Sequence, residues 1–390
     1  MNIPKRLNVS ISWFPHMASI NRAQWNTLAH ALKTPFLEWD WLHQMELSES
    51  ISPKTGWIPN HLTVWSDNRL VAAAPLYIKM HSEGEFVYDH VWADVAHRLG
   101  IRYFPKMIGM SPVTPVIGYR FLMAPDMDEK EITRIMLKQI DHFCLRNKLS
   151  GCSFLFVEPD WKNLMENLGY HGWVHQSFIW ENKGFKSFHD YLAQFRSNQR
   201  KNIRRELKVM EKQELVLKTF FKDEIPEQFL SLMYDFYVRT NAKFGPWGCK
   251  YLNRKFFEGL YENYRHRLLF VTAYKKSEGK TPSAMALLIN KEDHLYGRYW
   301  GCNQTFDSLH FNTCYYEPIR WAIEKGVQAY HPGAGGLHKV RRGFRAIAGY
   351  SLLRFYDLKL QNVMIHHISE INHLEQMEID QINAMLPFST

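Results

Sequence analysis

Three stretches decide the fold class of this chain: LLFVTAY (268–274), AMALLIN (284–290) and HLYGRYW (294–300). Each is a short run of mainly apolar and aromatic residues, which predicts a β-strand. The stretch FNTCYYEPIRWAIEK (311–325) follows with apolar residues at helical spacing, and VQAY (327–330) predicts one more short strand. This alternation of strands and helix is typical of an α/β unit.

The first half of the chain has a similar order of predicted elements. The expected elements are two amphipathic helices within 20–47, a β-hairpin of 61–65 with 70–79, a helix from Ile132 and an apolar strand at 152–157. Because both halves share this order, the sequence predicts a tandem of two similar α/β units. Pro318 lies inside the last predicted helix, where it is expected to kink that helix or start a new one.

A strongly basic segment joins the two halves. It opens at Ser187 with Asp190 three residues later, which is typical of a helix N-terminus. Residues 196–212 contain seven basic and two acidic side chains, a net +5 out of +9 for the whole chain. Guanidinium groups match phosphate oxygens, so a nucleotide, a tRNA or a lipid-linked phosphate is a candidate ligand. The alternative is a solvated helix between the two halves.

The predicted organisation therefore has three parts. An N-terminal unit spans residues 1–186 and contains a long irregular connection at 80–125, where glycine and proline are frequent. A basic linking helix and a C-terminal unit span residues 187–365. An amphipathic helix spans residues 366–390.

Composition excludes several classes of protein. The chain has 390 residues, of which 46% are hydrophobic, so it can form a sizeable core. Five scattered cysteines with no CxxC pair argue against a disulfide scaffold or a zinc ribbon and favour a reducing compartment, so we expect a cytoplasmic protein. The longest strongly apolar run is far shorter than the ~20 residues that span a bilayer, so no transmembrane helix is predicted.

An acidic cluster with an imidazole lies on the predicted connection after the hairpin. It contains His81, Glu85 and Asp89. A carboxylate both attracts an ammonium group and can accept its proton, so these residues are candidates for binding and deprotonating an amine. The alternative is an ordinary polar loop.

A second candidate segment ends the predicted strand at 294–300. A strand-to-helix turn at Gly301 leaves backbone N–H groups free to hold a phosphate or an oxyanion. Arg298 and Gly301 partly match the acyl-CoA signature of N-acetyltransferases, but Asn303 breaks it.

The third candidate segment is residues 331–344. Of the three segments, its residue pattern is the most typical of a functional site. Three glycines precede His338, Lys339 and Arg342, so the segment can hold an anion while His338 takes a proton. It lacks the Gly-Lys-Ser/Thr ending of a P-loop, which argues against nucleotide hydrolysis. A flexible turn is the alternative.

Other catalytic and metal-binding patterns are absent from the sequence. There is no Gly-x-Ser-x-Gly elbow, His-Glu-x-x-His helix or GxGxxG fingerprint. The histidines near the C-terminus (366, 367 and 373) are explained by the amphipathic helix, so no metal is expected.

Several motifs together resemble the bacterial FemAB-like predicted N-acyltransferases, a family labelled peptidoglycan biosynthesis or recognition. The matching strings are TGWIPNHL (55–62), APLYIKMHSEGEFVYD (74–89), RYFPK (102–106), LYGRYWGC (295–302), LHFNTCYY (309–316) and GAGGLHKVRRGF (333–344). The resemblance implies two tandem GNAT-like acyltransferase folds, each a mixed, mostly antiparallel sheet flanked by helices. It also implies transfer of an acyl or aminoacyl group from acyl-CoA or aminoacyl-tRNA to a small-molecule or peptide amine.

The resemblance extends to single residues of this sequence. The matching positions are His81, Glu85, Asp89, Lys106, Arg200, Lys201, Arg204, Arg298, His310, Tyr315, His338, Lys339 and Arg342. Our mechanistic hypothesis takes His338 or Glu85 as the base and Tyr315 or Tyr299 as the acid. The oxyanion would meet backbone N–H groups near Gly301 or in the Gly333–Gly336 turn.

The sequence departs from the family in the glycine-rich turn. His331 and Leu337 stand at positions where members of the family usually have acidic residues. If one of those acids is the catalytic base in the other members, His331 must replace it here or activity is lost. This departure keeps open a non-catalytic alternative, a degenerate transferase that binds a cell-wall precursor or RNA. A tRNA partner fits either reading through the basic strip; DNA is not expected, and the oligomeric state is open.

Overall fold

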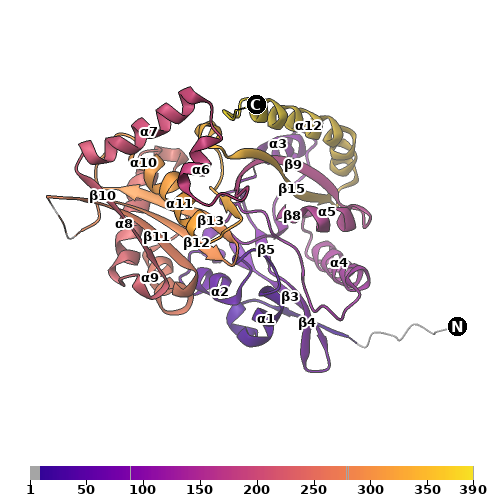
Figure 1. Cartoon of the computed structure of the whole chain (residues 1–390). Helices are drawn as coiled ribbons and strands as arrows, with labels where there is room; N and C mark the ends of the chain where they lie inside the picture. The colour runs from indigo at the N-terminus through magenta and orange to yellow at the C-terminus, as the bar shows by residue number, and fades with distance from the viewer. Residues whose placement is uncertain (1–8, 88, 278, 280, 390) are drawn as a thin grey trace. The chain divides into compact units, whose positions relative to one another are not determined.

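The computed structural model describes residues 9–389 apart from positions 88, 278 and 280 (Figure 1). Contacts divide the chain into two compact units. Unit 1 holds the described residues up to His175 and Gly349–His373, and unit 2 holds Gln176–Ala348 and the described residues from Leu374. Strands β9 (His171–Glu181) and β15 (Arg345–Phe355) each belong partly to both units. The domain boundaries expected at 186/187 and 365/366 remain a prediction.

Unit 1 contains two groups of strands with helices around them. In the first, β1 (Ser10–Phe14), β3 (His61–Ser66), β4 (Arg69–Ala74) and β7 (Leu122–Met123) lie in that order and are antiparallel. In the second, the order is β2 (Trp57–Pro59), β5 (Leu76–Lys79), β6 (Lys106–Gly109), β8 (Gly151–Val157) and β15, with β6 and β8 parallel. The helices are α1 (Arg22–Ala29), α2 (Trp39–Leu47), α3 (His90–Arg98), α4 (Glu129–Arg146) and α5 (Pro159–Glu166).

The predicted hairpin is present, but its second arm is shorter than expected. β3 and β4 pair in antiparallel register, with Leu62 opposite Ala74. Pro75 then ends the arm, because proline has no N–H to donate to a ladder. The residues after it form β5, which pairs with β2 and β6.

The prediction of an irregular connection over 80–125 is wrong for three parts of it, one of which is the two-residue strand β7. Residues 90–98 form α3, which buries Trp92 and Ala96, and residues 106–109 form β6, all four of which are buried. The frequent glycine and proline residues favoured the prediction of a loop over these short elements. A four-residue strand buried between β5 and β8 gains its hydrogen bonds from tertiary pairing rather than from local sequence pattern.

Unit 2 is built on an antiparallel run of four strands. These are β10 (Leu215–Phe221), β11 (Leu268–Lys275), β12 (Ala284–Lys291) and β13 (His294–Cys302), and the short β14 (Ala329–His331) pairs in parallel with β13. Helices α8 (Gln228–Ala242) and α9 (Arg254–Tyr264) lie on one face of these strands, and α10 (Leu309–Phe311) and α11 (Glu317–Glu324) on the other (Figure 1). The predicted α/β (α+β) class, with mixed, mostly antiparallel sheets flanked by helices, is confirmed.

The basic linking helix is divided in two. Ser187 caps α6 (Phe188–Ala193) as predicted, by accepting a hydrogen bond from the Asp190 N–H, and α7 (Ser197–Lys212) follows. The carbonyl groups of Ala193 and Phe195 at the break accept hydrogen bonds from the Arg200 side chain at 3.2 and 3.3 Å. Arg200 therefore satisfies the end of α6.

Pro318 shapes the segment that carries Tyr315. It is the second residue of α11, and residues 312–316 before it form a π-helical turn. Proline lacks the N–H that would bond to the Cys314 carbonyl four residues earlier, and the Tyr330 hydroxyl donates to that carbonyl instead, at 2.5 Å. The expected effect of Pro318 on the helix is thus confirmed.

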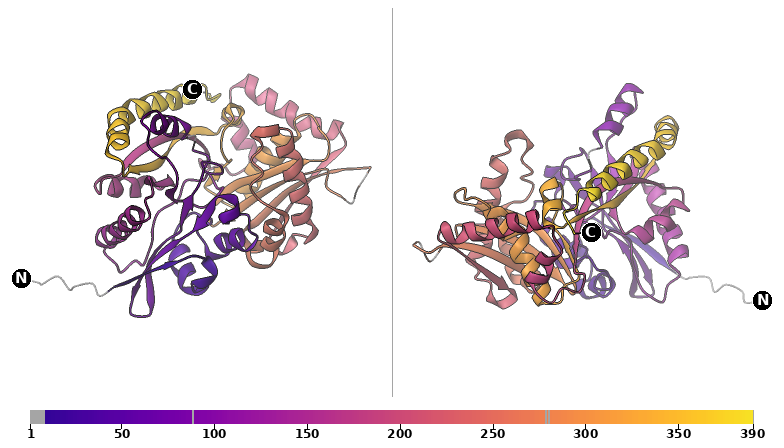
Figure 2. Two further views of the ribbon diagram at one scale, coloured as in Figure 1. Left: turned by 180° about the vertical axis from the view of Figure 1, so that it is seen from behind. Right: turned by 45° about the horizontal axis from the view of Figure 1, so that its top comes forward.

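The C-terminal helix α12 spans Leu358–Ala384 and is the long yellow helix in both views of Figure 2. It begins earlier than the predicted residue 366. The Asp357 carboxylate accepts hydrogen bonds from the N–H groups of Lys359 and Leu360, which caps the helix at that point.

Candidate active site

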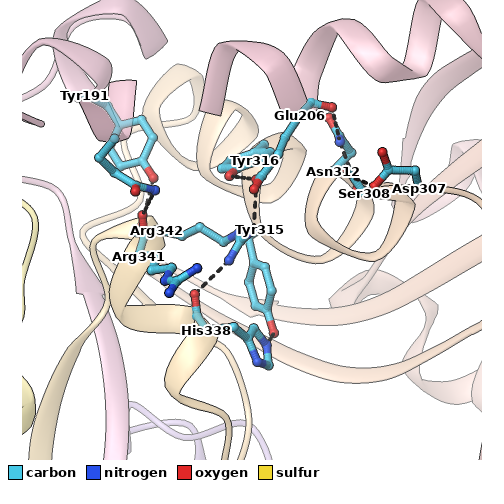
Figure 3. Close-up of polar contacts among 11 residues, drawn as sticks. Tyr191, Glu206, Asp307, Ser308, Asn312, Tyr315, Tyr316, His338, Arg341 and Arg342 are labelled. Carbon is cyan, nitrogen blue, oxygen red and sulfur yellow. Dashed lines mark hydrogen bonds and ion pairs between the residues drawn. The ribbon is translucent and has the colours of Figure 1, made fainter. Parts of the chain in front are cut away.

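The glycine-rich turn of unit 2 carries His338 toward Tyr315. His338 lies in a 3₁₀ turn (Leu337–Arg342) after three glycines with positive φ, at positions 333, 335 and 336. Tyr315 comes from the π-helical turn. The Tyr315 hydroxyl and the His338 Nε2 atom are 2.9 Å apart (Figure 3). The structure thus brings together two residues that the sequence placed in different motifs.

Both members of this pair are uncharged at neutral pH. Burial, followed by the positive charges of Lys339 and Arg342, lowers the pKa of His338 to about 4. Burial raises the pKa of Tyr315 far above its usual value. A neutral imidazole hydrogen-bonded to a neutral phenol can accept a proton on one side and release one on the other.

Arg342 holds the backbone of His338 in position. Its Nη1 group donates to the His338 carbonyl at 2.8 Å, and its Nη2 group donates to the Glu206 carboxylate at 2.8 Å (Figure 3). The Tyr316 hydroxyl donates to the same carboxylate. Arg342 is 2% exposed, and its guanidinium lies 3.3 Å from the centre of the Phe311 ring. The structure therefore places Arg342 in a clamp between α7 and the His338 turn, not at a surface open to phosphate.

Lys339 holds the glycine-rich turn in shape. Its Nζ atom donates to the carbonyl groups of Gly333 and Ala334, at 2.8 and 2.9 Å, and the side chain is buried. Burial lowers the pKa of Lys339 to about 7. Like Arg342, Lys339 makes hydrogen bonds within the protein that hold the backbone in shape.

Gly336 and His310 complete the immediate surroundings of His338. A side chain at position 336 would place its Cβ 2.5 Å from the His338 ring, and the φ of Gly336 is +93°. Only glycine therefore allows the turn to pass this close to the imidazole. The His310 ring lies 5.8 Å from the His338 ring, and burial, followed by His338, lowers the pKa of His310 to about 3.

The second candidate segment has a different setting from the one expected. Gly301 lies inside β13 rather than in a turn, and a Cβ there would come within 2.4 Å of the Phe236 carbonyl oxygen of α8. The prediction of a strand-to-helix turn at Gly301 is therefore wrong. Tyr299 accepts a hydrogen bond from Arg298 and packs against Tyr237 and Phe257 of α8 and α9.

His331 is part of a stack of rings. Its ring lies 4.8 Å from Tyr296 and 5.7 Å from His294, nearly parallel to both. Burial, followed by the charge of His294, lowers the pKa of His331 to about 3, although Glu181 acts in the opposite direction. The structure thus gives His331 a packing role at the end of β14.

This setting of His331 predicts a pH dependence of stability. Its pKa is about 3 in the folded chain against 6.5 for an ordinary histidine, so the unfolded chain binds more protons between these values. Stability should therefore fall as pH drops from 6.5 toward 3. We expect His331→Phe, which keeps a stacking ring, to weaken the loss of urea resistance between pH 7 and pH 5. An unchanged loss would contradict this assignment.

The acidic cluster of unit 1 is a buried ion network. The Lys106 Nζ atom donates to the Glu85 carboxylate at 2.8 Å and also to Asp89, and the Tyr103 hydroxyl donates to Asp89 at 2.7 Å. Glu85 is 0% exposed, so it does not lie on an open polar loop as one reading of the sequence expected. The pKa of Glu85 is raised by burial, against the charge of Lys106. Burial opposes ionisation of Asp89, but the charge and hydrogen bond of Lys106 together lower its pKa.

His81 lies beside this network on the same segment. Its Nε2 atom is 3.2 Å from the Thr55 carbonyl oxygen, and its ring fills the space over Gly56. Lys79, which the sequence did not single out, is buried with its Nζ atom 3.7 Å from the centre of the Trp57 ring. Burial lowers the pKa of Lys79 to about 7.

Two members of the clamp in unit 2 were also missed by sequence reasoning. Glu206 is one of only two acids in residues 196–212, and Tyr316 follows Tyr315 directly. An isolated acid within a run of cations was the available signal for a buried partner.

The remaining cations of α7 form an exposed basic groove. It is lined by Lys201, Arg204, Arg205, Lys208, Val209 and Lys212. Arg204 and Lys201 are exposed, whereas Arg200 is partly buried because it caps α6. The predicted basic strip is therefore open to solvent from residue 201 onward.

The described residues show neither a metal-ion site nor a membrane-spanning helix. They contain no group of three or more His, Cys, Asp or Glu side chains arranged to hold a metal ion. None of their helices is long and apolar enough to cross a bilayer.

Comparison with known proteins places this chain in a family. The FemAB-like family model, described as peptidoglycan biosynthesis/recognition, matches residues 16–390. The crystal structure of FemX is similar with a TM-score of 0.55 and 12% identity, over 88% of this chain and 98% of that chain. The C-terminal domain of a putative lysylphosphatidylglycerol synthetase from Agrobacterium fabrum has a TM-score of 0.52 and 8% identity, over 88% and 93%. A tandem GNAT protein from the clavulanic acid biosynthesis pathway has a TM-score of 0.46 and 11% identity, over 89% and 98%.

At these identities the structural likeness is one of fold. The likeness to FemX shows a shared fold, and the tandem GNAT-like architecture stays what the family resemblance implies. Curated protein sequences give no match. The family match also confirms the predicted connection with peptidoglycan. The chain belongs to the FemAB-like family of peptidoglycan biosynthesis and recognition.

Proposed function

We propose that this chain is an N-acyltransferase. It moves an acyl or aminoacyl group from acyl-CoA or aminoacyl-tRNA to an amine, with a peptidoglycan-type precursor peptide as the acceptor class. The observation that carries the proposal is the hydrogen bond between Tyr315 and His338, a neutral acid–base pair on the glycine-rich turn. Membership of a peptidoglycan-related family supports the class of acceptor.

In the proposed reaction, the acceptor amine attacks the acyl carbonyl carbon. The new C–N bond forms as the carbonyl oxygen becomes an oxyanion, and the amine loses a proton to His338. His338 accepts this proton at Nδ1 when its Nε2–H donates to the Tyr315 oxygen. Gly336, which has no side chain beside this edge of the ring, keeps the approach to Nδ1 open.

Tyr315 completes the proton transfer. The C–S bond of a thioester, or the C–O bond of an aminoacyl ester, breaks as the leaving group takes the Tyr315 hydroxyl proton. The Nε2–H of the His338 imidazolium returns a proton to the Tyr315 oxygen, so the amine proton ends on the leaving thiol or hydroxyl. Because the pKa of Tyr315 is raised, its hydroxyl stays protonated until this step.

The glycine-rich turn supplies the oxyanion donors in this proposal. Gly333, Gly335 and Gly336 have positive φ values, and turns with such backbone conformations can bind anions through their N–H groups. Lys339 fixes that shape through its two carbonyl contacts. We assign the oxyanion to the N–H groups of this turn rather than to Gly301, which lies within β13.

The basic groove on α7 is the proposed holding site for the polyanionic donor. Replacing Arg204, Lys208 and Lys212 together by Gln should weaken binding of a charged-tRNA pool about tenfold or more and reduce its salt dependence, because phosphate contacts are lost. Lys130, Arg134 and Lys138 on α4 have the same four-residue spacing and are exposed. The matching triple Gln variant on α4 should bind like the unaltered chain. Equal effects of the two triple variants would remove α7 from this role.

The donor class is tested by a thermal-shift titration with CoA, acetyl-CoA and a charged-tRNA pool, at low and moderate salt. Stabilisation by the CoA compounds identifies a CoA donor, since ligands of the folded state raise the unfolding temperature. Stabilisation by tRNA alone, decreasing with salt, identifies aminoacyl transfer. No stabilisation by any of the three would argue for the non-catalytic alternative, a binding protein derived from a transferase.

A further inference from the structure

The connection between α8 and α9 presents two large aromatic side chains to solvent. Phe244 is 60% exposed and Trp247 is 86% exposed. Among the described residues, no other exposed large apolar side chain has a higher exposed fraction than Trp247. Tryptophan is usually buried over most of its surface. Exposed apolar side chains that lie together are typical of a surface that binds a partner.

Hydrogen bonds hold the turn that carries these two side chains. The Trp247 N–H donates to the Phe244 carbonyl at 3.0 Å, and the Gly248 N–H donates to the Gly245 carbonyl at 3.1 Å. The Tyr237 hydroxyl of α8 donates to the Cys249 carbonyl at 2.7 Å and accepts from the Tyr251 N–H at 2.9 Å. The residues that follow the turn are thus hydrogen-bonded to α8.

The charge around this turn has a single sign. From Phe236 to Phe257 the chain contains five cationic residues and no acidic residue. Arg254 is paired with Asp235, whereas Arg239, Lys243 and Lys250 have exposed side chains. Exposed cations therefore lie on both sides of the two aromatic residues in the sequence.

We propose that this turn docks the protein on an anionic lipid bilayer. Phe244 and Trp247 insert at the level of the headgroups, where tryptophan is favoured because its ring is apolar and its N–H is polar. Lys243, Lys250 and Arg239 contact the anionic headgroups. A second copy of this chain is a poorer partner, because the same cations would face each other across a symmetric contact.

The proposal does not depend on the proposed transfer reaction. A bilayer fits both features of the turn at once, since insertion needs apolar rings and attraction needs cations. The basic groove on α7 is a separate cationic surface that could also attract anionic vesicles. The experiment must therefore separate insertion of the rings from simple charge attraction.

The test measures binding of the full chain to vesicles of phosphatidylcholine with and without phosphatidylglycerol. The unaltered chain should sediment with the phosphatidylglycerol vesicles. Phe244→Ser/Trp247→Ser should weaken this binding about tenfold or more, because two interfacial rings are lost. Lys243→Gln/Lys250→Gln should weaken it about fivefold per lysine at low salt.

Two controls make the outcome decisive. Leu47→Ser/Leu145→Ser removes two other exposed apolar side chains, which are 63% and 59% exposed, and should leave binding unchanged. The α7 triple Gln variant should keep binding that still depends on Phe244 and Trp247. Loss of all binding in the α7 variant, with none in the aromatic variant, would overturn the proposal.

Insertion itself is measured by quenching of tryptophan fluorescence with brominated lipids. The unaltered chain should be quenched more than Trp247→Phe, because Trp247 reaches the bromine atoms. Equal quenching of the two would contradict insertion. Binding of an RNA oligonucleotide that depends on the two rings, without vesicle binding, would replace the bilayer by single-stranded RNA as the partner.

Discussion

Replacing His338 by alanine should lower the rate of acyl transfer by about 10²–10⁴-fold, the usual contribution of a positioned general base. The protein should stay folded, because His338 is half-buried and its backbone carbonyl, which Arg342 binds, is retained. Transfer is measured as acylated acceptor per unit time, and folding as the urea unfolding midpoint. Full turnover by His338→Ala would remove His338 from the role of base.

The pH dependence of transfer is an independent test of His338 as the base. With a pKa of about 4, His338 accepts protons over the neutral range and loses this ability as pH falls through 4. The acid limb of kcat/KM should therefore lie near that value for the unaltered chain. His294→Ala, which alters another partly buried histidine of unit 2, should keep both the rate and the limb. A limb near 6.5 would show that the base has an ordinary imidazole pKa.

Replacing Lys106 by methionine should cause a large loss of stability. It would leave the Glu85 and Asp89 carboxylates buried without their cation. Removing one partner of a buried ion pair costs about 3–5 kcal/mol in free energy of unfolding. The measurement is urea unfolding of the full chain at pH 7.

Two control variants show whether buried charge is the cause. Lys106→Met/Glu85→Gln/Asp89→Asn removes the charges together and should recover part of the lost stability. Arg69→Met breaks the exposed pair with Asp126 and should change stability little. If Lys106→Met were as stable as Arg69→Met, the network would not hold unit 1 together.

Long periodic elements could be predicted from the sequence because their pattern is local. The paired helices α1 and α2, the strands β11 to β13 and the effect of Pro318 all follow from apolar spacing or from the missing proline N–H. The strand β6 could not be predicted, because four buried residues are defined by their neighbours in the sheet. The break between α6 and α7 depends on a contact of Arg200 and on the N–H of Arg196 bonding to the Pro387 carbonyl, both of which are tertiary.

The candidate site shows the same division. The glycine-rich turn and Tyr315 were found by residue type, since glycines with an imidazole and a phenol are recognisable chemistry. Their pairing at 2.9 Å could not be predicted from the sequence, because they are 23 residues apart and Tyr315 lies in a π-helical turn. Lys339 and Arg342 looked like phosphate ligands by charge alone, and the structure places both inside the protein. Charge pattern gives the kind of group but not the direction in which it points.

The most direct test of the account is a transfer assay that follows the acceptor by mass. The full chain is incubated with a peptidoglycan precursor peptide that has one free amine, in separate reactions with a charged-tRNA pool and with acetyl-CoA. One of the two reactions should add a single aminoacyl or acetyl group to that amine, and the same reaction with His338→Ala should not. An unmodified peptide in both reactions, with a donor bound to the chain, would contradict the account and identify a binding protein.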